Sequence, residues 1–235
     1  MPKLTSLDRT LSKRGLASRK DARALILAGR VRVDGRVITK PTQQIPADRA
    51  RIEIDDVAAG PQASRRMIAF HKPRGVVTTR RDPEGRKTVF DVLGDAAVGL
   101  VAVGRLDRAS TGLLLLTNDT DLANRLTDPA NRTIRRYVVT VRGRVEPDTA
   151  RRIETGVDVQ ASRGGTERLS AARVEIRKAS GRETHLIVDL VEGRNREIRR
   201  LFDAADHEVT RLHRVAFGDV ELGTLEPGEW REVSV

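Results

Sequence analysis

Apolar residues follow two different patterns along the chain, and the pattern changes near residue 60. Leu7 and Leu11 lie one helical turn apart, and Ser18 can cap a second helix that Gly29 ends. The next run, VRVDGRV (residues 31–37), alternates around an Asp-Gly pair, which predicts a hairpin. Residues 1–58 therefore predict a small domain of helices and short strands.

A segment rich in small residues, Gly and Pro follows, and it predicts a linker over residues 59–64. Beyond it, strand-like apolar runs outnumber helical stretches and do not alternate strictly with them. Residues 65–235 thus predict an α+β domain with flanking helices on a mixed, largely antiparallel sheet. The strand-like runs are RRMIAF, GVVTT, GLVAV, LLLLT, YVVTV, SAARVEI and THLIVDLVE, and helices are expected near 121–126, 147–154 and 195–205.

Charge narrows the possible partners. The 235 residues include 44 Lys and Arg against 33 Asp and Glu, and the net charge of +11 suggests nucleic acid or an anionic membrane surface. No apolar run approaches the ~20 residues that a membrane-spanning helix needs, and the N-terminus lacks a signal-peptide apolar region. We expect a soluble cytoplasmic protein with no membrane partner. Without cysteine or a recognised histidine spacing, we expect no metal.

Much of the positive charge lies in the first predicted domain. Nine basic and three acidic residues fall between Asp8 and Arg36. Few aromatic residues interleave them, so recognition of folded RNA by backbone and shape, or DNA binding, fits better than base stacking. A solvated helix face is the alternative. The candidate RNA-binding residues are Arg9, Lys13, Arg14, Arg19, Lys20 and Arg23.

The same segment carries a resemblance to a known domain. LDRTLSKRGLASRKDARALILAGRVRVDGRVITKP has a basic helix pair, a glycine and then V-x-V-D-G. It resembles the RNA-binding domain named after ribosomal small-subunit protein four, the S-four domain. The resemblance implies binding to structured RNA.

The run GRLDRASTGLLLLT, residues 104–117, carries the leading candidate for chemistry. Asp107 lies between Arg105 and Arg108, and nearby positive charge favours an ionised carboxylate that can act as nucleophile or base. Gly104 allows a tight turn that leads into an apolar strand. The alternative is an aspartate that caps the turn or pairs with Arg105.

A second cluster, EGRNREIRRLFDAADH, predicts a helix with one apolar face. Arg199 falls on the border of that face, where it can meet a buried carboxylate, whereas Arg196 and Arg200 point away. A surface arginine with a packed stem is the alternative. The apolar face consists of Ile198, Leu201, Phe202 and Ala205.

Tyr137, the only tyrosine, lies in the strand-like run RRYVVTV. Such a residue is either part of the core or a ring placed to stack on a base. No phosphate-binding glycine loop, dinucleotide fingerprint or Ser-His-Asp spacing is visible in the sequence. We therefore expect a reaction without a cofactor.

These segments together resemble a pseudouridine synthase of the group that carries an S-four domain and acts on ribosomal RNA. The resemblance runs from Leu7 to Val233, and the pairing of GRLD with EGRNR-x-(I/V)-RR is highly specific. It implies isomerisation of uridine to pseudouridine within ribosomal RNA. The loop DPEGRKTVFDVL is closer to the members that act on large-subunit (23S) RNA.

The resemblance also implies roles for individual residues. Asp107 would be the catalytic aspartate, as nucleophile or base, and Arg199 its ion-pair partner. Tyr137 would stack on the target base and later assist proton removal, while Arg105 would hold RNA with the uridine flipped out and Ile198 would pack against the base. Further candidates for substrate binding are Lys72, Arg74, Arg194 and Arg196.

Two other functions compete with this interpretation. A non-catalytic ribosome-assembly factor could keep the same fold, but a binding module has no need of Asp107, Tyr137 and Arg199 together. A DNA-binding regulator would predict a recognition helix and dimer symmetry, and neither is evident. The expected partner is ribosomal RNA or a ribosome assembly intermediate, and the expected state is a monomer.

Overall fold

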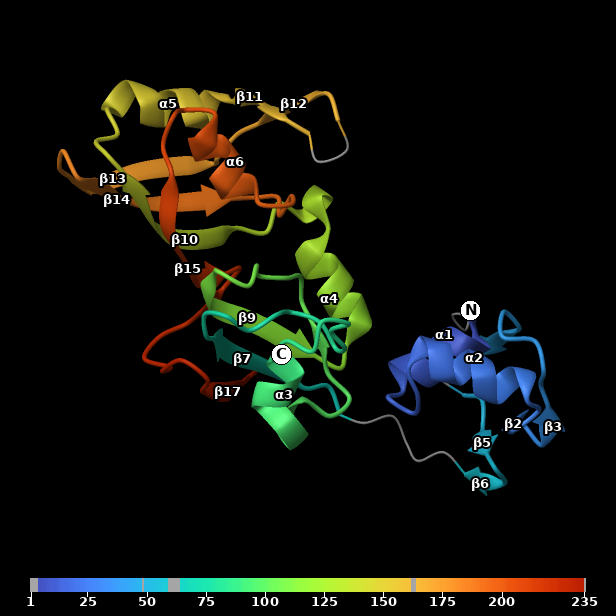
Figure 1. Ribbon diagram of the computed structural model, residues 1–235. Helices are drawn as coiled ribbons and strands as arrows, with labels where there is room; N and C mark the ends of the chain where they lie inside the picture. Colours follow the sequence, from blue (N-terminus) through green and yellow to red (C-terminus); the bar gives the residue numbers. More distant parts are fainter. Residues whose placement is uncertain (1–3, 48, 59–63, 162–163, 235) are drawn as a thin grey trace. The chain divides into compact units, whose positions relative to one another are not determined.

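The computed structural model describes residues 4–47, 49–58, 64–161 and 164–234 (Figure 1). The chain divides into two compact units, one of Met1–Arg65 with Asn118–Thr120 and one of Arg66–Thr117 with Asp121–Val235. The predicted linker falls mostly on residues 59–63, which lie outside the described part. In the described ranges, no helix has the length and apolarity to cross a membrane.

The first unit packs two helices against short strands. Its core includes the fully buried Leu7, Leu11 and Ile26. Ser18 caps the second helix by accepting the Asp21 backbone N–H at 3.2 Å, as predicted. The Asp-Gly pair turns the predicted hairpin with positive φ at both residues. The elements are β1 (Leu4–Ser6), α1 (Leu7–Lys13), α2 (Arg19–Leu27), β2 (Val31–Val33), β3 (Arg36–Val37), β4 (Gln44–Pro46), β5 (Ile52–Ile54) and β6 (Val57–Ala58).

The second unit is built on a large mixed sheet, which has nine strands among the described residues. The main path runs β13-β14-β10-β15-β9-β7-β17, and only the β15–β9 pair is parallel within that path. The predicted α+β class with a mixed, largely antiparallel sheet is confirmed. The strands are β7 (Met67–Lys72), β8 (Val101–Ala102), β9 (Thr111–Thr117), β10 (Arg135–Arg142), β13 (Arg173–Ala179), β14 (Glu183–Leu190), β15 (Val209–Phe217), β16 (Val220–Glu221) and β17 (Trp230–Val233).

Helices flank this sheet along its length (Figure 1). Those towards the end of the chain lie over the half that contains β10, β13 and β14, together with a separate hairpin of β11 and β12. The elements are α3 (Val89–Leu93), α4 (Thr120–Thr127), α5 (Pro147–Thr155), β11 (Val157–Gln160), β12 (Thr166–Leu169) and α6 (Glu197–Asp203).

A glycine permits the one parallel contact in the main sheet path. Gly112 at the start of β9 has φ +102°, and a Cβ there would lie 2.2 Å from the Arg214 carbonyl oxygen on β15. A side chain at residue 112 would therefore collide with backbone. Close approach of these strands brings the turn around Asp107 beside β15.

Two local expectations are wrong. The run GVVTT does not form a strand, since Val77 makes only an isolated bridge to Thr88. The segment DPEGRKTVFDVL, interpreted as a loop, ends in helix α3. Thr88 and Asp91 form a capping box in which each side chain accepts the other's backbone N–H, and this local signal starts the helix.

Candidate active site

A cavity of about 460 Å³ opens in the second unit, between the turn that precedes β9, strands β10 and β15, and the turn that precedes α6. Its size is within the range of pockets that hold small ligands. It is lined by Gly104, Arg105, Leu106, Asp107, Ser110, Thr127, Pro129, Arg135, Tyr137, Leu190, Glu192, Gly193, Arg194, Asn195, Arg196, Glu197, Ile198, Leu212, Arg214 and Phe217.

Asp107 lies half-buried in a turn that hydrogen bonds fix on both sides. Its carbonyl oxygen accepts the Ser110 N–H at 3.0 Å. Just before it, Leu106 is held by Thr78, whose hydroxyl donates to the Leu106 carbonyl at 2.9 Å. Arg105 is exposed next to it and also lines the cavity. A carboxylate fixed in this way is pre-organised to meet a reacting group.

The cavity unites most of the residues that the resemblance singled out. Tyr137 on β10 is 7% exposed and pairs across the sheet with Arg214 on β15. Ile198 at the start of α6 is 3% exposed. Both line the same cavity as Asp107, so a carboxylate, an aromatic ring and an aliphatic wall surround one space.

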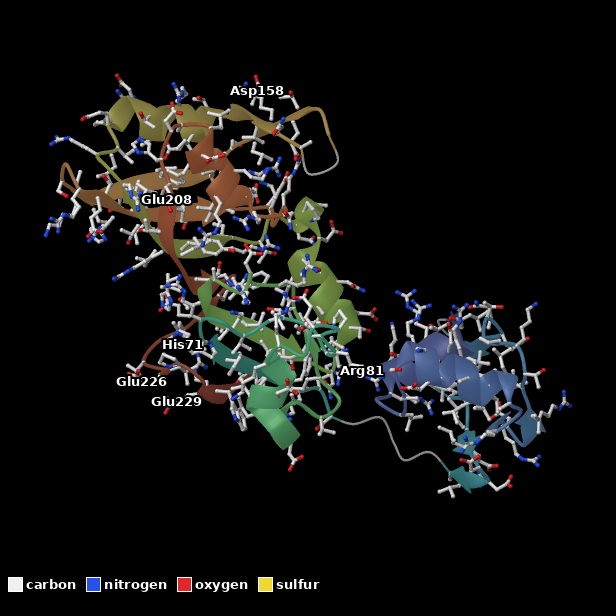
Figure 2. All side chains as sticks on the ribbon, in the orientation of Figure 1. His71, Arg81, Asp158, Glu208, Glu226 and Glu229 are labelled. Atoms are coloured by element: carbon white, nitrogen blue, oxygen red, sulfur yellow. The ribbon has the colours of Figure 1, made fainter. Side chains whose placement is uncertain are left out.

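Arg199 is placed differently from the expected ion pair. Its Nη1 donates to the Val209 carbonyl oxygen at 2.7 Å, and within the described ranges it makes no ion pair with Asp107. Burial lowers the pKa of Arg199, and the charge of Asp107 partly opposes that shift. The charge of Glu208, labelled in Figure 2, also opposes the lowering of the Arg199 pKa. Arg199 therefore influences Asp107 across a gap rather than by direct contact.

Lys72, a predicted substrate-binding residue, is fully buried and is not among the residues that line the cavity. Its Nζ donates to the carbonyl oxygens of Pro73 at 3.0 Å and Ser110 at 2.8 Å. Burial lowers its pKa from 10.5 to about 8, and the nearby Asp107 charge opposes this shift. Lys72 thus holds the turn that contains Asp107 from inside the protein.

The other predicted substrate contacts lie at the surface. Arg74, Arg194 and Arg196 are exposed, and the last two line the cavity. Arg194 forms ion pairs with Glu167 on β12, at 2.6 Å, and with Glu192. Arg74 and Arg196 both act electrostatically on Arg199, which places their charges near it.

Three buried charged residues of the cavity were not predicted. Arg135, Glu197 and Arg214 are 4%, 5% and 2% exposed, and all line the cavity. Burial raises the pKa of Glu197 to about 6. The sequence does contain a signal for Arg135. Side chains two residues apart in a strand point to the same face of the sheet, so Arg135 in RRYVVTV shares a face with Tyr137.

Comparison with known proteins decides the family. The sequence model described as RNA pseudouridylate synthase matches residues 66–204, a stretch that includes Asp107, Tyr137 and Ile198. The chain belongs to the RNA pseudouridylate synthase family. The model of the S4 domain matches residues 5–48, so this pseudouridine synthase also has the predicted S-four domain.

Individual relatives agree with this assignment. The chain is 35% identical to an uncharacterized RNA pseudouridine synthase of Aquifex aeolicus (strain VF5), over 97% of this chain and 90% of that one. It is 38% identical to ribosomal large subunit pseudouridine synthase B of Vibrio vulnificus (strain CMCP6), over 97% and 72%. A crystal structure of a pseudouridylate synthase superposes with a TM-score of 0.69 at 27% identity, over 98% and 96%.

Proposed function

We propose that this pseudouridine synthase isomerises uridine to pseudouridine in the large-subunit (23S) ribosomal RNA, with Asp107 as the reacting carboxylate. The observation that carries the proposal is the cavity in which Asp107, Tyr137 and Ile198 meet. Its relatives named ribosomal large subunit pseudouridine synthase B support the choice of RNA.

The reaction breaks the bond between ribose carbon 1 and uracil nitrogen 1, turns the base and rejoins the sugar to carbon 5, from which a proton then leaves. Asp107 acts as nucleophile at carbon 6 or as base on the ribose, and both fit a carboxylate at the cavity wall. Tyr137 stacks on the base and later takes part in proton removal. Ile198 packs against the base, and the walls limit water while the base is detached.

Exposed basic side chains hold the RNA in this proposal. Arg9, Arg19, Lys20 and Arg23 of the S-four unit are exposed and meet phosphates in this proposal, while Arg105 and Arg196 do so at the cavity. Arg14 contributes differently, because its Nη2 donates to the Ala47 and Ala50 carbonyls and so ties the unit together. Binding must offset the few kcal/mol needed to extrude a base.

The protein in this proposal works as a monomer in the cytoplasm, on free ribosomal RNA or an assembly intermediate. The test uses 23S and 16S transcripts with tritium at uracil carbon 5, because isomerisation releases that tritium. We expect release from 23S RNA, with or without bound ribosomal proteins, and none from 16S RNA. Release from 16S RNA alone would refute the subunit assignment. No release from any RNA would refute the proposed function and favour a non-catalytic binding factor.

A further inference from the structure

Two buried guanidiniums form one wall of the cavity. Arg135 and Arg214 are 4% and 2% exposed, and both guanidiniums lie over the ring of Phe217, with their Cζ atoms 4.7 and 5.0 Å from its centroid. Arg135 shares its face of β10 with Tyr137, and Arg214 pairs with Tyr137 across the strands. Two cations thus stand beside the ring that is proposed to stack on the substrate base.

Neither guanidinium is neutralised by a direct partner in the described part of the chain. Arg135 donates only to backbone carbonyls, those of Leu126, Thr133 and Val191, and Arg214 Nε donates to the Leu113 carbonyl at 2.7 Å. The Nη2 atom of Arg214 is buried without any hydrogen-bond partner. Burying a charge or a hydrogen-bond donor is unfavourable in free energy unless another group neutralises the charge or accepts the hydrogen bond.

Asp107 and Glu197, two carboxylates of the cavity, form no ion pair with these guanidiniums in the described part of the chain. Asp107 is held in the turn before β9, and Glu197 uses one carboxyl oxygen to accept the Arg194 backbone N–H at 3.0 Å. Glu197 acts on Arg135 only at a distance beyond an ion pair. The wall is therefore suited to an anion that arrives with the substrate.

How deep the arginines lie in the cavity indicates whether that anion is a backbone phosphate or the base. The exposed Arg105, Arg194 and Arg196 also line the cavity, where backbone phosphates stay accessible. Arg135 and Arg214 lie deeper, beside the buried Phe217 and Tyr137, where a flipped base enters. A phosphate would have to be stripped of water to reach them, whereas the base is extruded into the pocket in any case.

We propose that Arg214, assisted by Arg135, stabilises the negative charge on uracil while it is detached from ribose. This rests on the proposed function. When the C1′–N1 bond breaks, its electron pair stays with the base and spreads over N1 and the carbonyl oxygens. A uracil carbonyl then supplies the missing acceptor for Arg214 Nη2. The pair is used again when carbon 5 bonds to the ribose, and the proton on carbon 5 leaves.

The first test compares single-turnover isomerisation with RNA affinity. Arg214→Met should lower the rate on saturating 23S transcript by about 100-fold, a loss typical of removing one donor to a developing anion, with less than a threefold change in Kd. Arg214→Lys should restore part of the rate. The exposed Arg182→Met is the matched control and should change neither value. A normal rate for Arg214→Met would overturn the proposal.

The second test does not require turnover and separates charge stabilisation from packing. Free 5-nitrouracil is anionic at neutral pH because the nitro group acidifies the ring, whereas uracil is neutral. We expect wild type to bind 5-nitrouracil at least tenfold more tightly than uracil, and Arg214→Met or, if that variant does not fold, Arg135→Met to lose most of this preference. Equal affinity in wild type, or a preference unchanged in the variants, would refute the inference. A preference without tritium release would instead refute the proposed function alone.

Discussion

At the scale of single residues, the turn that carries Asp107 is held by a cation that is fully buried. The ammonium of Lys72 bonds two carbonyl oxygens, one of them on Ser110, three residues after Asp107. Burial makes this charge unfavourable, which is why the pKa of Lys72 falls to about 8. The protein keeps the lysine at a cost in stability and gains a fixed position for the Asp107 turn.

This cost gives a pH-dependent prediction. Between about pH 8 and pH 10.5 the unfolded chain holds the Lys72 proton more tightly than the folded one, so this residue makes stability rise with pH in that window. The free energy of unfolding of wild type, relative to Lys72→Met, should therefore rise by about 2 kcal/mol from pH 8 to pH 9.5. Urea unfolding of both proteins, with the exposed Lys40→Met as control, measures it; a pH-independent difference would contradict it.

At the scale of elements, the sequence predicts the regular parts well and the irregular parts poorly. The helix cap at Ser18 and the hairpin of the S-four unit follow from local residues. Strand β15 was missed, because bulges opposite β10 break its two-residue alternation and Arg214 occupies a core position. Arg135 and Arg214 become visible as site residues only when the strands are paired.

The same strand contact predicts an intolerant position. Gly112→Ala would force β9 and β15 apart, because its Cβ would lie 2.2 Å from backbone. We expect a loss of at least about 3 kcal/mol in the free energy of unfolding. Gly85→Ala also has a positive φ but open space around it, and should lose only about 1 kcal/mol. Thermal and urea unfolding compare the two; similar losses would show that the close approach is unimportant.

At the scale of the whole molecule, binding and chemistry are assigned to different units. The S-four unit supplies exposed cations, and the second unit holds the cavity. Asp8 shows why these cations are not equivalent, since Arg19 and Arg23 each approach its buried carboxylate at 3.4 Å. Arg9 and Lys20 are exposed and serve as the cleaner probes of RNA contact.

Replacing Arg9 and Lys20 together by Gln should weaken RNA binding without changing the rate at saturation. If both contact phosphates, the slope of log affinity against log salt should become shallower by about 1.5, because fewer counterions are released. Filter binding across a salt series measures it. The matched control replaces two exposed cations of the β13–β14 hairpin, Lys178 and Arg182. An unchanged slope would show that these two residues do not contact RNA phosphates.

In the proposed function, Asp107 performs the isomerisation. The most direct measurement is tritium release from 23S transcript under single turnover by wild type and Asp107→Asn, with the exposed Asp219→Asn as control. We predict release by wild type and by Asp219→Asn, and none by Asp107→Asn even though that variant still binds the RNA. Release by Asp107→Asn at the wild-type rate would show that Asp107 is not the reacting carboxylate.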